Sequence, residues 1–351
     1  MNTVRIESVI LERLTAVQRQ SGQSRWQRWS QRVVLAFAAG LVLASAAVAQ
    51  DYPARQIVVI VPFPAGGATD ILARILSEPM RVALGQPVVV QNVPGAGSTI
   101  GVGRAIQSAP DGYTLSIGNW TSHVGASAVY PVSWNVLTDL EPVAMLSTTT
   151  LIIVGRTGLP VNNGKELIAW LKANPDQATA ATVGAGSGAH ICGIYFEQKT
   201  GTRVRYVPYR GGAPVMADLM GNQIDLFCGE ASQMLQHFVA GRIKPLVVMS
   251  KSRWLPLPEV PTMEELGASD THITFWQGLW APKGTPRDII AKLNDAVVKA
   301  FGDPVVIKRL TELGQSIPAR EQLTPEALAA FHKSEINKWW PLIKGANIKA
   351  E

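Results

Sequence analysis

The chain has 351 residues and a formal net charge of +6, from 32 basic and 26 acidic side chains. A chain of this length can bury a large core and is expected to divide into two lobes. Beyond the first 32 residues, its basic side chains form no arginine- or lysine-rich run with interleaved aromatics, so nucleic acid is not an expected partner.

The first 49 residues have the pattern of a secretory signal peptide. Residues 1–32 contain six arginines and two glutamates, and residues 33–48 are almost wholly apolar. This apolar run is shorter than the ~20 residues that a membrane anchor needs, and it ends in Ala47-Val48-Ala49, an A-x-A cleavage site. We therefore expect export with cleavage after Ala49, and loss of the signal peptide lowers the formal charge from +6 to about +2.

The next segment predicts a strand, a glycine-rich turn and a helix. Residues 57–61 are apolar and mostly β-branched, PFPAGGATD follows at 62–70, and apolar residues then recur at helical spacing. We expect Thr69 to be the N-cap of this helix and Asp70 to lie in its first turn, so that free backbone N–H groups face the space above the sheet. The alternation continues to a strand at 114–117 and predicts a parallel sheet with helices on both faces.

A second α/β unit is predicted between two segments that cross from one lobe to the other. The apolar segment 143–155 is long enough to cross, and a strand-like run at 273–281 returns. Between them we expect strands at 179–183, 204–207, 224–228 and 244–249 and helices at 164–173, 190–199, 214–222 and 232–240. Helices at 286–301, 304–313 and 325–344 complete the first lobe. We expect lobe 1 to comprise 50–152 plus 275–351, lobe 2 to comprise 153–274, and hinges near 150–155 and 272–277.

Seven motifs occur in an order that is similar to that of one protein family. They are YPARQIVVIVPFPAGGATDILAR (52–74), VVVQNVPGAGSTIG (88–101), DGYTLSIGN (111–119), GAGSGAH (184–190), VPYRGGAPVMADLMGNQIDLF (207–227), LPEVPTMEELG (257–267) and GLWAPKGTP (278–286). With these motifs the chain resembles the Bug family, the substrate-binding proteins of tripartite tricarboxylate transporters. The resemblance implies an α/β fold of the type II-like periplasmic-binding-protein class, a hinged Venus flytrap. In this fold each of two lobes is a β-sheet flanked by helices, and two segments cross between the lobes.

The resemblance also implies a function. It implies a monomeric periplasmic solute-binding protein that captures a small organic anion, an aliphatic or aromatic mono- or dicarboxylate, for integral membrane transporter subunits. It implies no catalysis, and the two rival interpretations are an exported α/β hydrolase that uses Ser187 and His190 and a periplasmic ligand sensor of a signalling system. The five histidines are scattered and no P-loop lysine motif occurs, so we expect neither a metal nor a cofactor.

Candidate ligand contacts come from four segments that follow expected strands, where open α/β sheets bind their ligands. Glycines and a helix start let backbone amides approach a carboxylate closely. On the resemblance, the first turn contributes Phe63, Ala65, Gly66, Gly67, Thr69 and Asp70, GAGSGAH contributes Ser187, Gly188, Ala189 and His190, and the other two segments contribute Asn119, Trp120, Thr121, Arg210 and Gly211. Two alternatives remain open, because Arg210 also fits a solvated turn and Trp120 also fits the core.

The two cysteines, Cys192 and Cys228, and the residues after Phe227 need a separate interpretation. Cysteine packs as a small hydrophobe, so we expect two buried thiols, with a disulfide as the alternative in an exported chain. After Phe227 the family often has an apolar residue and then Asp, whereas this chain has Cys228, Gly229 and Glu230. The departure removes support for a ligand contact at position 229 and indicates a substrate different from that of amino-acid-binding relatives.

Overall fold

A computed structural model describes residues 52–268, 272–345 and 348 of the protein. These residues belong to one unit, Tyr52–Glu351. The predicted signal peptide, residues 1–49, and its cleavage after Ala49 lie outside the described residues. Within the described ranges no helix combines the length and the apolar character needed to cross a membrane.

The strands form a nine-stranded mixed sheet in the order β2-β1-β3-β9-β4-β7-β5-β6, with β8 also paired to β4. They are β1 (Ile57–Val61), β2 (Val88–Asn92), β3 (Thr114–Asn119), β4 (Leu140–Arg156), β5 (Thr179–Thr182), β6 (Arg205–Pro208), β7 (Leu226–Glu230), β8 (Ile243–Val248) and β9 (Thr274–Pro282). β1 pairs in parallel with β2 and β3, because β1 and β2 are each followed by a helix that returns the chain to the same edge. The predicted parallel arrangement of these three strands is confirmed.

The part of the sheet built from the second α/β unit also follows the sequence pattern. β5 pairs in parallel with β6 and β7, whereas β7 and β8 pair with β4 in the antiparallel direction. The four strands and four helices predicted for this unit are present, with ends within two residues of the predicted ones.

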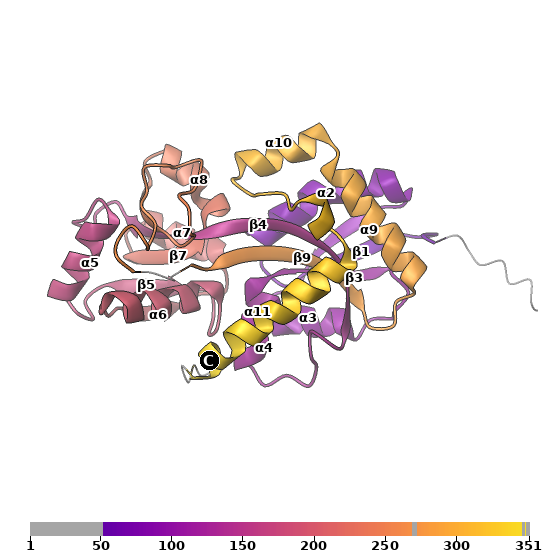
Figure 1. Ribbon diagram of the computed structural model, residues 1–351, viewed down its shortest axis with the longest axis horizontal. Helices are drawn as coiled ribbons and strands as arrows, with labels where there is room; N and C mark the ends of the chain where they lie inside the picture. Colours follow the sequence, from indigo (N-terminus) through magenta and orange to yellow (C-terminus); the bar gives the residue numbers. More distant parts are fainter. Residues whose placement is uncertain (1–51, 269–271, 346–347, 349–351) are drawn as a thin grey trace, which may run out of the picture. The chain divides into compact units, whose positions relative to one another are not determined.

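Two long strands, β4 and β9, connect the two ends of the sheet (Figure 1). Residues Leu140–Thr150 of β4 pair with β9, whereas Leu151–Arg156 pair with β7 and β8. β4 is buried along most of its length, as expected for a strand in the middle of a sheet that helices cover. These two strands are the crossing segments of the predicted fold class, while the exact limits of the lobes and hinges stay a prediction.

The helices flank this sheet (Figure 1). They are α2 (Ala68–Leu84), α3 (Thr99–Ile106), α4 (Ala126–Val129), α5 (Gly164–Ala173), α6 (Gly188–Thr200), α7 (Gly212–Met220), α8 (Ala231–Val239), α9 (Arg287–Phe301), α10 (Pro304–Glu312) and α11 (Pro325–Gly345). Short 3-10 turns occur at Ala96–Ser98 and Arg320–Gln322, and a π-helical turn occurs at Thr121–Gly125.

The start of α2 differs from the prediction in one residue that bears on the site. The helix begins at Ala68 and its N-cap is Gly67, which has an extended backbone conformation. Thr69 therefore lies inside the helix, and its prediction as the N-cap is wrong, because Gly67, itself an acceptable N-cap residue, precedes the first helical residue. Asp70 lies in the first turn, as predicted.

Cys192 on α6 and Cys228 on β7 form a disulfide, with 6.3 Å between their Cα atoms. The expectation of two buried thiols is therefore wrong. Both residues are buried, with exposed fractions of 0% and 6%, so burial was predicted correctly. Their pairing follows from the packing of α6 against β7, which the spacing of the two cysteines does not reveal.

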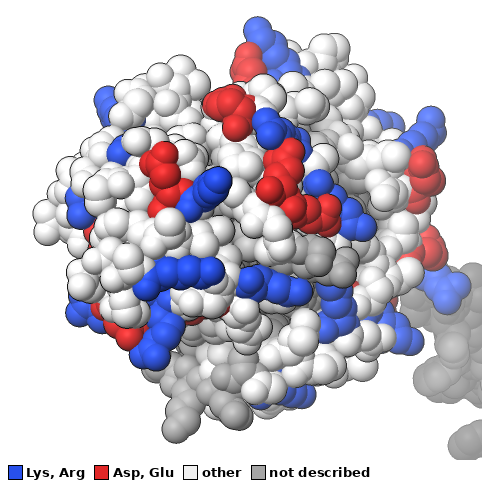
Figure 2. Space-filling model, turned by 60° about the vertical axis from the view of Figure 1, so that its left-hand side comes forward, with Lys and Arg blue, Asp and Glu red and all other residues white. Residues whose placement is uncertain are grey.

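Charged side chains of both signs occur on the face shown in Figure 2, with broad uncharged areas between them. Among the described residues, exposed ion pairs include Arg203 with Asp176 at 2.7 Å and Arg253 with Glu265 at 2.9 Å. Because exposed pairs of this kind contribute at most about 1 kcal/mol each, the stability of the fold rests mainly on the buried core.

Candidate ligand-binding site

A cavity lies where the first turn and β3 meet the loops of the second α/β unit. Its volume is about 60 Å³, which is enough for several water molecules, since one buried water needs about 10–15 Å³. Seven of the predicted ligand contacts line it, namely Phe63, Gly67, Thr69, Asn119, Thr121, Ala189 and Gly211. The other eight lie outside its lining, namely Ala65, Gly66, Asp70, Trp120, Ser187, Gly188, His190 and Arg210.

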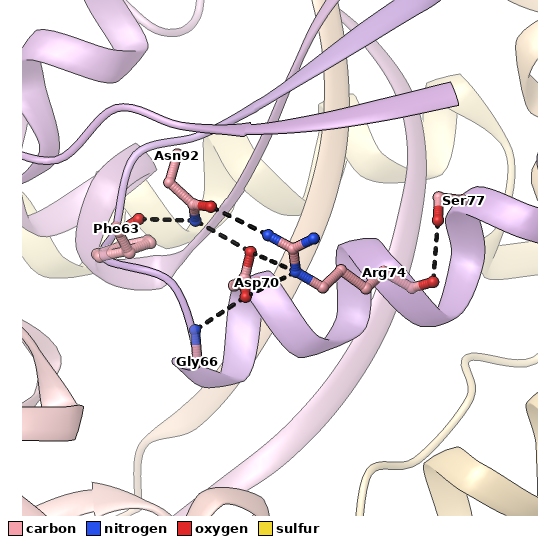
Figure 3. Close-up of polar contacts among 6 residues, drawn as sticks. All are labelled: Phe63, Gly66, Asp70, Arg74, Ser77 and Asn92. Atoms are coloured by element: carbon pink, nitrogen blue, oxygen red, sulfur yellow. Dashed lines mark hydrogen bonds and ion pairs between the residues drawn. The ribbon is translucent and has the colours of Figure 1, made fainter. Parts of the chain in front are cut away.

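Asp70 does not line the cavity, and its polar contacts hold the first turn in place (Figure 3). Its carboxylate accepts hydrogen bonds from the backbone amide of Gly66 at 2.9 Å, from Arg74 Nε at 3.0 Å and from Asn92 Nδ2 at 3.0 Å. Asn92 Nδ2 also donates to the carbonyl oxygen of Phe63 at 3.0 Å. Burial alone would raise the pKa of Asp70, but these hydrogen bonds together hold the pKa below its usual value. Asp70 is therefore a structural anion that fixes the turn.

The first turn of α2 presents hydrogen-bond donors to the cavity. Within the described chain no side chain caps its amides, and Gly67, Ala68 and Thr69 all line the cavity. The hydroxyl oxygen of Thr69 accepts a hydrogen bond from Asn119 Nδ2 at 3.0 Å. Because that bond occupies an acceptor position, the hydroxyl hydrogen of Thr69 is left to donate. The α2 terminus, with its positive dipole end, is suited to an anion.

The start of α6 uses most of its polar groups internally. Ser187 is fully buried and is the N-cap, and its hydroxyl accepts from the amide of His190 at 3.2 Å. The amide of Gly188 donates to the hydroxyl oxygen of Thr121 at 2.9 Å. Ala189 lines the cavity, and Thr121, like Thr69, keeps its hydroxyl hydrogen for another acceptor. Burial lowers the pKa of His190, whose ring packs 4.9 Å from that of Tyr206.

The start of α7 is a contribution that sequence reasoning largely missed. Gly211 is the N-cap, no side chain within the described residues caps the helix, and Gly211, Gly212 and Ala213 line the cavity. The paired glycines before a helical pattern were the available signal. Arg210, predicted near the ligand, is exposed and lines a neighbouring cavity of about 680 Å³ instead.

Glu230 is another lining residue that was not predicted. It ends β7, precedes α8, and is the one ionisable side chain among the described residues that line the cavity. Its side chain is half-buried and lines the cavity, and the loss of hydration there raises the pKa of its carboxyl to about 8. Its polar neighbour is Gln277 on β9, whose Nε2 lies 3.5 Å from Glu230 Oε2.

The apolar part of the wall does not come from the predicted tryptophan. Trp120 is fully buried and packs edge-on against Trp339, with ring centroids 5.4 Å apart. Trp120 therefore packs in the core, which was the alternative interpretation of this residue. Phe63, Phe227 and Phe275 supply aromatic surface to the cavity instead.

The sequence and the structure are similar to those of known proteins. Residues 72–348 match the family described as the tripartite tricarboxylate transporter family receptor. Protein BugT of Bordetella pertussis is 35% identical over 321 residues, which cover 90% of this chain and 98% of BugT.

Solved structures with the same fold include proteins with bound acids. The periplasmic binding protein BugD has a TM-score of 0.81 at 36% identity, over 86% of this chain and all of BugD. MatC of Rhodopseudomonas palustris with bound malate has a TM-score of 0.79 at 32% identity, over 83% of this chain and all of MatC. A second R. palustris protein, with adipate, has a TM-score of 0.81 at 30% identity, over 85% of this chain and 99% of that one.

Proposed function

This chain belongs to the tripartite tricarboxylate transporter receptor family of periplasmic solute-binding proteins, and we propose that it captures a small organic mono- or dicarboxylate and delivers it to integral membrane transporter subunits. The relatives solved with malate and with adipate support a carboxylate as the ligand. The family is a binding family, and the hydroxyl of Ser187, which the hydrolase alternative needs as nucleophile, serves as the cap of α6.

The observation that carries the proposal is the surplus of hydrogen-bond donors around the cavity. The uncapped amides of α2 and α7 and the hydroxyls of Thr69 and Thr121 all line it, and both hydroxyls already accept a bond from the protein. Donors without acceptors suit a carboxylate, which offers about four lone-pair sites. Each helix terminus adds about 0.3–1 kcal/mol, and up to about 2 kcal/mol where it is partly buried.

In this proposal the capture step needs no cationic side chain. The carboxylate lies against the α2 and α7 termini, directly or through ordered water, and Thr69 and Thr121 donate to its oxygens. The amide cluster predicted at Ser187–Ala189 contributes through Ala189 only. The two lobes close over the bound acid by bending near the crossing strands, and the closed form is the one presented to the transporter.

Calorimetric titration of three variants with the best ligand from a panel of carboxylates tests this capture step. One hydrogen bond to a charged group contributes about 1.5–3 kcal/mol, so Thr69→Val and Thr121→Val should each weaken binding roughly ten- to a hundredfold. Arg210→Gln is the matched control, because Arg210 lines the neighbouring cavity, and it should change the affinity less than about threefold. Loss of binding in Arg210→Gln with normal binding in Thr69→Val would show that a side-chain ion pair holds the ligand.

A further inference from the structure

The cavity combines many donors with one carboxyl group and no cation among its described lining residues. Glu230 is that carboxyl, and the proposed ligand is itself an anion. Two negative charges within one small, partly enclosed cavity repel each other. Either the ligand brings a positive group to Glu230, or Glu230 carries a proton when the ligand is bound.

The surroundings of Glu230 favour the protonated form. The strands beside β7 offer it no cation, since β5 has no ionisable residue and β4 has only Glu141 and Arg156, both near its ends. On α6 the ring of His190 packs against Tyr206, and on α7 Asp218 accepts a hydrogen bond from the hydroxyl of Tyr209. Burial without a compensating cation disfavours the carboxylate form of Glu230, in line with its pKa of about 8.

The partner of Glu230 on β9 leaves one carboxyl oxygen available to the ligand. Gln277 Nε2 approaches Glu230 Oε2 at 3.5 Å, which is a long contact, and no hydrogen bond within the described chain engages Glu230 Oε1. Gln277 is fully buried, and its own Oε1 has no partner in the described chain. A protonated carboxyl is a donor, so the side of the cavity that holds Glu230 recognises a hydrogen-bond acceptor.

We infer that Glu230 is the specificity-determining residue of this site: it donates a hydrogen bond as a neutral carboxylic acid to a second acceptor group of the ligand, so the preferred ligand is a dicarboxylate and not an acid that bears an ammonium group. This inference rests on the proposed function. It assigns the first carboxylate to the helix termini and the second to Glu230. Binding of such a ligand then takes up a proton wherever free Glu230 is ionised.

The experiment compares wild type, Glu230→Gln and the control Glu312→Gln by calorimetric titration with malate, succinate, adipate and aspartate. Glutamine keeps a neutral donor at position 230 and cannot ionise, whereas Glu312 lies exposed on α10. We expect one of the three dicarboxylates without an ammonium group to bind wild type at least tenfold more tightly than aspartate, which carries one, at pH 7. Its affinity should fall about tenfold from pH 7 to pH 9, because ionised Glu230 must first be protonated.

The two variants separate the role of Glu230 from a general effect of pH. At pH 7 the affinity of Glu230→Gln for the dicarboxylate should lie within about threefold of the wild-type affinity. The affinity of this variant should be the same at pH 9 as at pH 7. Glu312→Gln should keep the pH dependence of wild type. At pH 9, titrations in buffers of different ionisation enthalpy should show uptake of about 0.9 proton per ligand by wild type and none by Glu230→Gln.

Four results would overturn the inference. Tighter binding of aspartate than of malate, succinate and adipate, lost in Glu230→Gln, would make Glu230 an ionised partner of an ammonium group. An affinity of wild type that does not change between pH 7 and pH 9 would exclude the neutral acid, and so would the same pH dependence in Glu230→Gln. Binding of none of the four acids to folded wild type would refute the proposed function as well, whereas the first three results leave carboxylate capture intact.

Discussion

Removal of the disulfide between Cys192 and Cys228 tests the packing of α6 against β7 beside the cavity. The bond joins residues 36 positions apart in sequence, and Cys228 itself lines the cavity. Replacing both cysteines by alanine removes the crosslink without adding a buried hydroxyl. We expect the double variant Cys192→Ala/Cys228→Ala to fold and to be less stable than wild type.

The size of the effect follows from the length of the loop that the disulfide closes. For a loop of this length, the crosslink lowers the entropy of the unfolded chain by about 13 cal/mol/K, which is about 3.8 kcal/mol at 25 °C. The unit Tyr52–Glu351 has about 300 residues. With an unfolding entropy of about 2.1 cal/mol/K per residue, its melting temperature should fall by about 6 °C.

Scanning calorimetry of both proteins, each refolded with and without a thiol reductant, measures this effect. Wild type refolded in reductant should melt close to the double variant, and the variant should not respond to the reductant. Alkylation followed by mass spectrometry should find no free thiol in exported wild type. Two alkylated cysteines, or equal melting temperatures with and without the reductant, would show that the residues are buried thiols after all.

Three further changes test other groups. Asp70→Asn removes the charge that accepts from Arg74 and should lower the free energy of unfolding by roughly 1.5–3 kcal/mol in urea titrations at pH 7. The pKa of Asp70 is lower in the folded chain than in the unfolded chain, so this stabilisation is present above the unfolded-state pKa and is lost as the pH falls through the folded-state pKa. A variant as stable as wild type at pH 7 would contradict this role of Asp70. Ser187→Ala removes the N-cap hydroxyl that accepts a hydrogen bond from the His190 amide. Calorimetry should find a free energy of unfolding lower by roughly 0.5–2 kcal/mol and a nearly unchanged ligand affinity. A large loss of affinity would instead place Ser187 in contact with the ligand. Burial lowers the pKa of His332 to about 4, so below pH 6.5 the unfolded chain takes up a proton that the folded chain does not. Between pH 7 and pH 5 the free energy of unfolding of wild type should therefore fall by roughly 2 kcal/mol more than that of His332→Gln. Equal losses in the two proteins would refute the lowered pKa.

The order and type of the strands and helices could be predicted because local patterns determine them. Short apolar runs such as Ile57–Val61 stand between glycine- or proline-rich turns, and helical spacing follows each turn. The predicted ends agree with the structure within two residues in the second α/β unit. The predicted N-cap of α2 was wrong by two residues, because Gly67 and Thr69 are both acceptable N-cap residues and only the backbone path of the turn selects one of them.

The loops that form the site could be predicted from the sequence, but the individual groups that face the ligand could not. Glycine turns before helices identify the termini of α2, α6 and α7, which do reach one cavity. Whether a polar group faces the ligand depends on what else it bonds, and Ser187 and Asp70 are both engaged within their own segments. Glu230 was visible only as a departure from the family pattern, because the burial that perturbs it arises from strands distant in sequence.

The pairing of β4 with β9 has a mechanical consequence. Over Leu140–Thr150 the two strands share a hydrogen-bonded ladder, so they act as one ribbon and not as two independent tethers. Sliding one strand along the other would break the ladder, whereas bending both together keeps it. The register of this ladder shifts between Pro142 and Ala144 and again between Met145 and Ser147, and such irregularities are where a strand bends most readily. The shared ladder therefore resists sliding of β4 along β9 and leaves joint bending of the two strands as the motion that preserves their hydrogen bonds.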